Sequence, residues 1–126
     1  MTALETPRHR VEGLGSAHSG VQQFWHLRVT GAALALLSLW FAYVTIGLAT
    51  ANQISVLAFF QHPLNAVLMG AFMLVSCYHM TLGLREVIED YVHTNGLKIF
   101  FLLLVRIFGF AVAITATVAL FRIATP

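Results

Sequence analysis

Residues 29–84 read VTGAALALLSLWFAYVTIGLATANQISVLAFFQHPLNAVLMGAFMLVSCYHMTLGL and contain no Asp, Glu, Lys or Arg. A helix crosses a hydrocarbon core about 30 Å thick with about 20 residues. This run of 56 residues, from 29 to 84, is therefore long enough for two crossings and a short turn. Polar and helix-breaking residues lie near its middle, at Asn52-Gln53 and at Gln61-His62-Pro63. We expect one helix over about 29–50 and a second over about 63–92.

The remainder of the chain adds a third apolar run. Residues 97–121 are interrupted only by Lys98 and Arg106. Asn95-Gly96, just before this run, is a typical helix stop signal and agrees with an end of the second helix near residue 92. The sequence thus predicts an all-α membrane protein with three transmembrane helices. Residues 1–28 form an N-terminal cytoplasmic or interfacial segment, and residues 29–126 form the transmembrane part.

The composition supports this fold class and excludes several functions. Hydrophobic residues make up 59% of the 126 residues and charged residues 10%, with a mean hydropathy of +0.82. A soluble domain usually carries about 25% charged residues. A net charge of +2 without a basic stripe argues against nucleic acid as a partner. Because Cys77 is the single cysteine, the chain alone forms no disulfide and holds no iron–sulfur cluster.

The positive charges favour one orientation in the membrane. Five lie in the N-terminal segment and in the second loop, which share a side if there are three crossings: Arg8, Arg10, Arg28, Arg85 and Lys98. Only Arg122 lies at the opposite side. Lys and Arg gather on the cytoplasmic side of membrane proteins. We expect a cytoplasmic N-terminus and a C-terminus outside.

Small residues recur at four-residue spacing on each expected span. The pairs are Gly31 and Ala35, Ala66 and Gly70, and Gly109 and Ala113. Such spacing allows helix backbones to approach closely in lipid, although Gly and Ala are also common in membrane helices generally.

His79 is the ionisable residue that most needs an explanation. It lies six residues before Arg85, about 9 Å inside the membrane boundary at 1.5 Å per residue. An ionisable side chain at that depth is costly and is a candidate for function. It either hydrogen-bonds a neighbouring helix or holds a metal or cofactor. At 100° per residue Gly83 falls near its face, and this missing side chain would leave room for a flat macrocycle; imidazole is a common axial ligand of haem iron.

The cytoplasmic end of the second helix carries an acid and a phenol, Asp90 and Tyr91. Tyr91 is either an ordinary interfacial anchor or a hydrogen-bond donor to a quinone carbonyl, with Asp90 relaying protons. Arg28, at the start of the first span, is either a cation that reaches the interface or the partner of an anionic group such as a haem propionate.

The segment from Tyr78 to His93, YHMTLGLREVIEDYVH, resembles the signature of one of the two hydrophobic membrane anchors of succinate dehydrogenase (complex II). That anchor family shows a His, ten residues, and then Asp-Tyr, as His79 and Asp90-Tyr91 do here. Residues 20–30, GVQQFWHLRVT, are similar to the family's entry into its first helix, including the Arg.

The resemblance implies a four-subunit enzyme of electron transport and the tricarboxylic acid cycle in the bacterial inner membrane. Its other members are a flavoprotein, an iron–sulfur protein and a second membrane anchor. By the resemblance, His79 is an axial ligand of haem b, which the two anchors share. Tyr91 and Asp90 then serve the ubiquinone site, and Arg28 lies near the haem propionates and the quinone pocket. On this interpretation the chain is not an enzyme in isolation.

Other functions remain open at the level of sequence. The chain could instead be the membrane anchor of a quinol:fumarate reductase, an enzyme that catalyses the reverse reaction. It could also be a structural anchor without haem. A small transporter is disfavoured, because the acidic residues gather at one end of the membrane and no repeat is visible.

Overall fold

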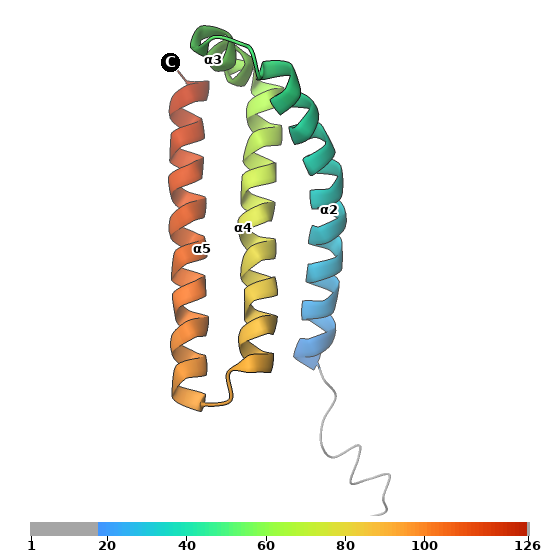
Figure 1. Ribbon diagram of the computed structural model, residues 1–126, viewed down its shortest axis with the longest axis vertical. Coiled ribbons are helices and arrows are strands. Elements are labelled where there is room, and N and C mark those ends of the chain that lie inside the picture. The colour runs from blue at the N-terminus through green and yellow to red at the C-terminus, as the bar shows by residue number, and fades with distance from the viewer. Residues whose placement is uncertain (1–17, 126) are drawn as a thin grey trace, which may run out of the picture.

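The computed structural model describes residues 18–125, which form four helices (Figure 1). The helices are α2 (His18–Leu48), α3 (Gln53–Gln61), α4 (Pro63–Tyr91) and α5 (Asn95–Ala124). Three segments are long and apolar enough to span a bilayer: Gly20–Leu48, Pro63–Tyr91 and Asn95–Ala124, which contain 18-residue windows with mean hydropathies of 1.8, 1.6 and 2.5. The predicted fold class, an all-α membrane protein with three spans, is confirmed. Arg8 and Arg10, two of the cations from which the orientation was predicted, lie outside the described residues.

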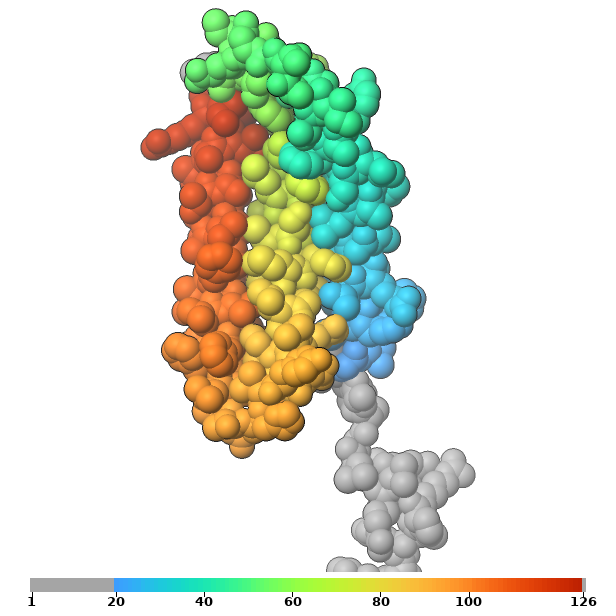
Figure 2. Space-filling model, viewed as in Figure 1, coloured from blue at the N-terminus to red at the C-terminus, as the bar shows by residue number. Residues whose placement is uncertain are grey.

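The long helices stand side by side, with α4 between α2 and α5 (Figure 1). The short helix α3 packs against α4 and α5 and covers one end of the bundle (Figure 2). The result is a layer one helix thick rather than a closed bundle. Within the described residues only two apolar side chains are buried, Val44 at 6% and Met69 at 9% exposure. The broad faces therefore meet lipid or other chains.

Two helix boundaries near the first loop differ from the prediction. The first helix begins at His18 rather than near 29, because hydropathy locates the membrane-spanning part and not the polar turns that extend the helix beyond it. The expected turn contains the additional helix α3. Its N-cap is Asn52, whose side chain accepts a hydrogen bond of 2.9 Å from the Ser55 amide. Pro63 occupies the first turn of α4, as its missing N–H predicts.

The predicted end of the second helix near residue 92 is confirmed, but Asn95-Gly96 does not act as its stop. Helix α4 ends at Tyr91, and Asn95 and Gly96 are the first residues of α5. The break lies earlier, where Val92 and Thr94 adopt extended backbone angles. Asn and Gly are also favourable near helix starts, so the pair alone does not distinguish the two ends.

Glycines provide the close approaches between helices. A β carbon on Gly109 would overlap the Thr81 side chain of α4, and one on Gly70 would lie 3.3 Å from Leu120 of α5. On the other side of α4, a β carbon on Gly31 would lie 3.4 Å from Cε1 of His79. The small residues singled out by their spacing therefore include three at which helices meet closely.

Candidate functional site

His79 lies at the contact between α4 and α2. Its ring is half-buried, and its Nδ1 lies 2.8 Å from Oγ1 of Thr30 on α2. The absence of a side chain at Gly31 leaves space for the ring beside that helix. The imidazole is therefore held by one nitrogen against the neighbouring span.

A second polar contact joins the same helices at the same level. The Tyr78 hydroxyl lies 3.0 Å from Nδ1 of His26, and the two rings meet edge to face with centroids 6.0 Å apart. The Thr30 hydroxyl also lies 2.6 Å from the His26 carbonyl oxygen. The Thr30–His79 and His26–Tyr78 contacts connect residues 49 and 52 positions apart in sequence, and together they fix the register between α2 and α4.

The other ring nitrogen of His79 is accessible. No hydrogen bond to its Nε2 is present within residues 18–125, and no buried side-chain nitrogen or oxygen in that range lacks a partner, so Nε2 is not enclosed. One turn along α4, a β carbon on Gly83 would meet no atom within 4 Å. The expected open space beside His79 is present, and imidazole nitrogen is a suitable donor to iron. These residues therefore fit a haem ligated through His79.

A charged hollow lies between the start of α2 and the end of α4. Its volume is about 590 Å³. The lining residues are Gly20, Gln23, Phe24, Leu27, Arg28, Glu86, Glu89 and Asp90. Arg28 lies over the Phe24 ring, 4.4 Å from its centroid, which orients the guanidinium by a cation–π contact. One cation and three acids thus share an open cavity at one end of the membrane layer.

The acids in the hollow differ in their partners. Oε1 of Glu89 accepts a hydrogen bond of 2.6 Å from Nε of Arg85, and the Glu89 carbonyl accepts one of 3.1 Å from Nζ of Lys98. Within residues 18–125 the Arg85–Glu89 ion pair is the only one present. Asp90 is exposed and lines the same cavity as Arg28.

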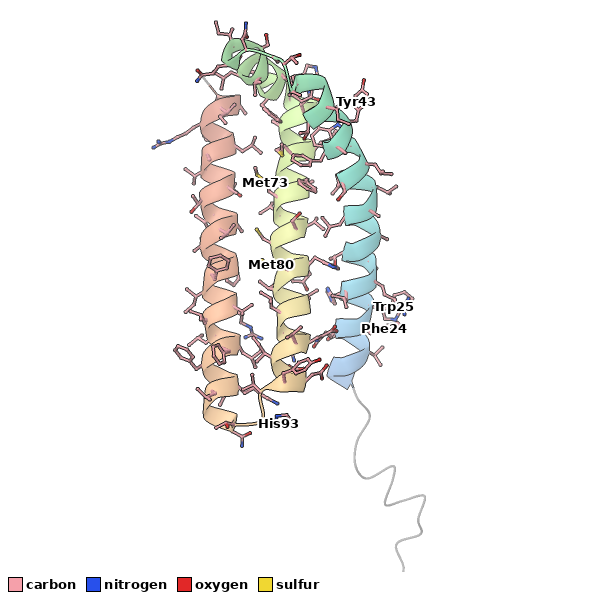
Figure 3. All side chains as sticks on the ribbon, viewed as in Figure 1. Phe24, Trp25, Tyr43, Met73, Met80 and His93 are labelled. Carbon is pink, nitrogen blue, oxygen red and sulfur yellow. The ribbon has the colours of Figure 1, made fainter. Side chains whose placement is uncertain are left out.

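The structure brings together some of the predicted site residues and separates others. Arg28 and Asp90 lie in one hollow, and His79 lies further along the same helix contact. Tyr91 is 78% exposed at the end of α4 and is not among the lining residues. The link between α4 and α5 contains His93 and lies beyond the hollow (Figure 3).

Sequence reasoning missed Thr30 and the Tyr78–His26 pair. Thr30 is a polar residue near the start of the charge-free run, and this is the signal that could have drawn attention to it. Its partner depends on the register between α2 and α4. The residue pattern of either helix alone does not specify that register.

Another cavity lies between α4 and α5. It has a volume of about 470 Å³, a largely apolar lining and two cations, Arg85 and Arg106. No hydrogen bond to the Arg106 side chain occurs within the described part of the chain. Arg106 instead lines this apolar space between the two helices.

The fold and the site define a multi-pass membrane protein with ionisable side chains within and at the ends of its spans. Residues 2–117 match the family model of the succinate dehydrogenase/fumarate reductase transmembrane subunit. The chain belongs to this family, as its resemblance to a succinate dehydrogenase membrane anchor predicts. It is a multi-pass protein of the bacterial inner membrane.

Curated relatives agree with this assignment over nearly the whole chain. A succinate dehydrogenase hydrophobic membrane anchor subunit from Paracoccus denitrificans is 38% identical over 117 residues, which cover 93% of this chain and 90% of the relative. The corresponding protein from Rickettsia conorii is 34% identical over 114 residues, covering 89% and 90%. No solved structure matches the chain.

Proposed function

We propose that the chain is a membrane anchor of succinate:ubiquinone oxidoreductase that takes part in electron transfer to the quinone. In this proposal it contributes His79 to haem b and Arg28, Asp90 and Tyr91 to the site at which ubiquinone is reduced. Its partners are a second membrane anchor, an iron–sulfur protein and a flavoprotein that oxidises succinate. The observation that carries the proposal is an imidazole held between two spans by Nδ1, with Nε2 accessible and open space at Gly83.

The flatness of the helix layer supports a shared haem site. A single layer encloses no macrocycle, so one face of the haem would rest on this chain and the other on the sister anchor. Haem supplies a one-electron carrier near the quinone. His79 would bind its iron, and Arg28 would attract a propionate through charge-assisted hydrogen bonds.

The charged hollow supports quinone reduction. Ubiquinone takes up two electrons and two protons to become ubiquinol. The electrons come from succinate through the partner proteins, and the protons come from water. Asp90 is exposed to solvent and can pass protons, while Tyr91 and Arg28 can donate hydrogen bonds to the quinone oxygens. The large exposure of Tyr91 leaves its hydroxyl available to a quinone or a partner chain.

The test is Tyr91→Phe in the purified four-subunit complex. We expect succinate-dependent reduction of ubiquinone to fall, while succinate oxidation with an artificial acceptor stays unchanged. Tyr43→Phe is the matched control. Tyr43 is similarly exposed, at 79%, but lies near the C-terminal end of α2, at the other end of the layer from Tyr91 (Figure 3). Equal loss in both assays, or no loss in either, contradicts a role of Tyr91 in the quinone site.

The second candidate is a haem-free structural anchor, which the Thr30–His79 hydrogen bond favours because it satisfies one ring nitrogen without iron. Reduced-minus-oxidised absorption spectra of the complex distinguish the two. We expect bands of a bis-imidazole haem that His79→Ala abolishes or shifts and that His62→Ala, in the α3–α4 link, leaves unchanged. Absent bands, or unchanged bands in His79→Ala, favour the structural anchor. The quinol:fumarate reductase direction is tested by the midpoint potential of the native quinone.

A further inference from the structure

We propose that Thr30 is a positioning residue for His79, accepting the Nδ1–H so that the Nε2 lone pair is left for haem iron. The inference rests on the proposed function and extends it to a residue that does not touch the haem. It concerns the tautomer of the imidazole, its orientation and its strength as a ligand.

Three short contacts determine where the hydrogens lie. The Thr30 hydroxyl has one hydrogen, and its oxygen lies 2.6 Å from the His26 carbonyl oxygen and 3.2 Å from the Leu27 carbonyl oxygen. Two oxygens 2.6 Å apart repel each other unless a hydrogen lies between them, and a carbonyl cannot donate it. The hydroxyl therefore donates to the His26 carbonyl. At the 2.8 Å contact with His79 it must accept, so Nδ1 carries the ring hydrogen.

This tautomer is the one that a metal ligand requires. A neutral imidazole has one N–H and one lone pair, so a hydrogen on Nδ1 leaves the lone pair on Nε2. The two nitrogens lie on opposite sides of Cε1, and the ring is held at Nδ1 and packed at Cε1 beside Gly31. Nε2 therefore faces away from the Thr30 hydroxyl.

The same bond changes the electronic properties of the ligand. When a second group accepts the N–H of a ligating imidazole, the other nitrogen becomes more basic and the ring orientation is fixed. A more basic ligand stabilises ferric over ferrous iron and lowers the midpoint potential. Loss of such a partner typically costs about 10–100-fold in metal affinity. Removing the Thr30 hydroxyl should therefore raise the midpoint potential and weaken haem binding.

A second threonine of α2 makes the same bond to the backbone of its own helix. Thr45, further along α2, makes the same bond to the carbonyl four residues earlier, at 2.8 Å from the Phe41 oxygen, and no imidazole contact accompanies it within the described residues. Thr45 thus reproduces the local backbone interaction of Thr30 without His79. This makes Thr45→Val a matched control for Thr30→Val.

The experiment uses the assembled complex and measures haem content, midpoint potential and the electron paramagnetic resonance signal of the ferric haem. In Thr30→Val we expect a raised midpoint potential, altered signal anisotropy and a haem affinity reduced about 10–100-fold. Thr30→Ser restores the hydroxyl and should return all three toward wild type, and Thr45→Val should change none of them. Wild-type potential and signal in Thr30→Val overturn the inference.

Two further measurements keep the inference falsifiable and separate it from the proposed function. Electron–nuclear double resonance on the unsubstituted complex reports the hydrogen bonding of the ligand N–H without any mutation. A weakly bonded or absent Nδ1–H overturns the inference. If His79→Ala retains the wild-type haem bands, the proposed haem ligation fails. If His79→Ala loses them while Thr30→Val matches wild type, only the role of Thr30 fails.

Discussion

At the scale of single residues, the acids of the charged hollow differ in whether their carboxylates form an ion pair within residues 18–125. Glu89 is already committed to Arg85, whereas Asp90 lines the hollow beside Arg28 without an ion pair in the described range. The Arg85–Glu89 pair is more than a third exposed on both sides, so water screens it, and a pair of this kind contributes at most about 0.5 kcal/mol.

We therefore expect Asp90→Asn to lower ubiquinone reduction by about 10²-fold, the lower end of what a positioned proton-transfer group contributes. Succinate oxidation with an artificial acceptor should persist. Glu89→Gln is the control and should leave ubiquinone reduction and thermal stability close to wild type. The measurement is the ratio of the two activities in the purified complex. A larger fall in that ratio for Glu89→Gln than for Asp90→Asn would contradict the assignment of Asp90.

The residues of the candidate site were partly predictable from the sequence. His79 stands out because an ionisable group in an apolar run is costly, and Asp90 and Arg28 stand out because they border such runs. Thr30 does not stand out, since threonine is common in spans and its contact with His79 joins residues 49 positions apart. That pairing depends on helix register, which packing between α2 and α4 decides.

At the scale of elements, the contact between α4 and α5 depends on the missing side chain at Gly109. A β carbon there would overlap Thr81, whereas one on Gly47, on α2, would meet no atom within 4 Å. Replacing glycine by alanine therefore tests helix packing at position 109 and helix propensity at position 47.

We expect Gly109→Ala to lower the thermal stability of the complex, because α4 and α5 must separate or Thr81 must move. Gly47→Ala should leave it unchanged or raise it slightly, since Ala is favoured over Gly in a helix by about 1 kcal/mol. Differential scanning calorimetry of the assembled complex measures both. Equal unfolding temperatures for the two variants would mean that Gly109 does not set the helix separation.

The cap of α3 gives a second prediction at this scale. Asn52→Ala removes the acceptor of the Ser55 amide and should destabilise the helix by about 1 kcal/mol, while Asn52→Ser retains a capping oxygen. Amide hydrogen exchange over residues 53–61 should be faster in Asn52→Ala than in Asn52→Ser or wild type. Unchanged exchange in the alanine variant would show that packing on α4 and α5, rather than the cap, holds α3.

The elements also show where sequence patterns are ambiguous. Asn52-Gln53 and Gln61-His62-Pro63 were correctly identified as breaks, but the apolar residues between them form α3 rather than a turn. Asn95-Gly96 was assigned to a helix end and forms a helix start. Both differences have the same origin, because residues that interrupt one helix also favour the beginning of the next.

At the scale of the whole molecule, hydropathy predicted the three spans, but not the order in which they lie. The spans follow from the length and composition of the apolar runs. The central place of α4 follows from glycine contacts on both of its sides, at Gly31 and at Gly109. Because the layer is one helix thick, its apolar faces are exposed in the isolated chain, and the sister anchor proposed above would cover one of them.

The arrangement also locates the charges that set the orientation in the membrane. Arg28 lies in the hollow with the end of α4, and Lys98 at the start of α5 bonds the Glu89 carbonyl, so these cations gather at one end of the layer. The opposite end carries α3 and Arg122 near the end of α5 (Figure 1). Cations retained on the cytoplasmic side would place α3 outside.

We therefore expect opposite accessibility for cysteines introduced at Thr50 and Thr94, both exposed and located at opposite ends of the layer. In a Cys77→Ala background, a membrane-impermeant maleimide should label Thr50→Cys in intact spheroplasts and Thr94→Cys only in inverted membrane vesicles. Labelling after detergent solubilisation and denaturation is the control that both thiols are present and reactive. The reverse pattern would mean that the cations at the hollow end do not determine the topology, and it would place the proposed proton-relay residue Asp90 on the outer side of the membrane.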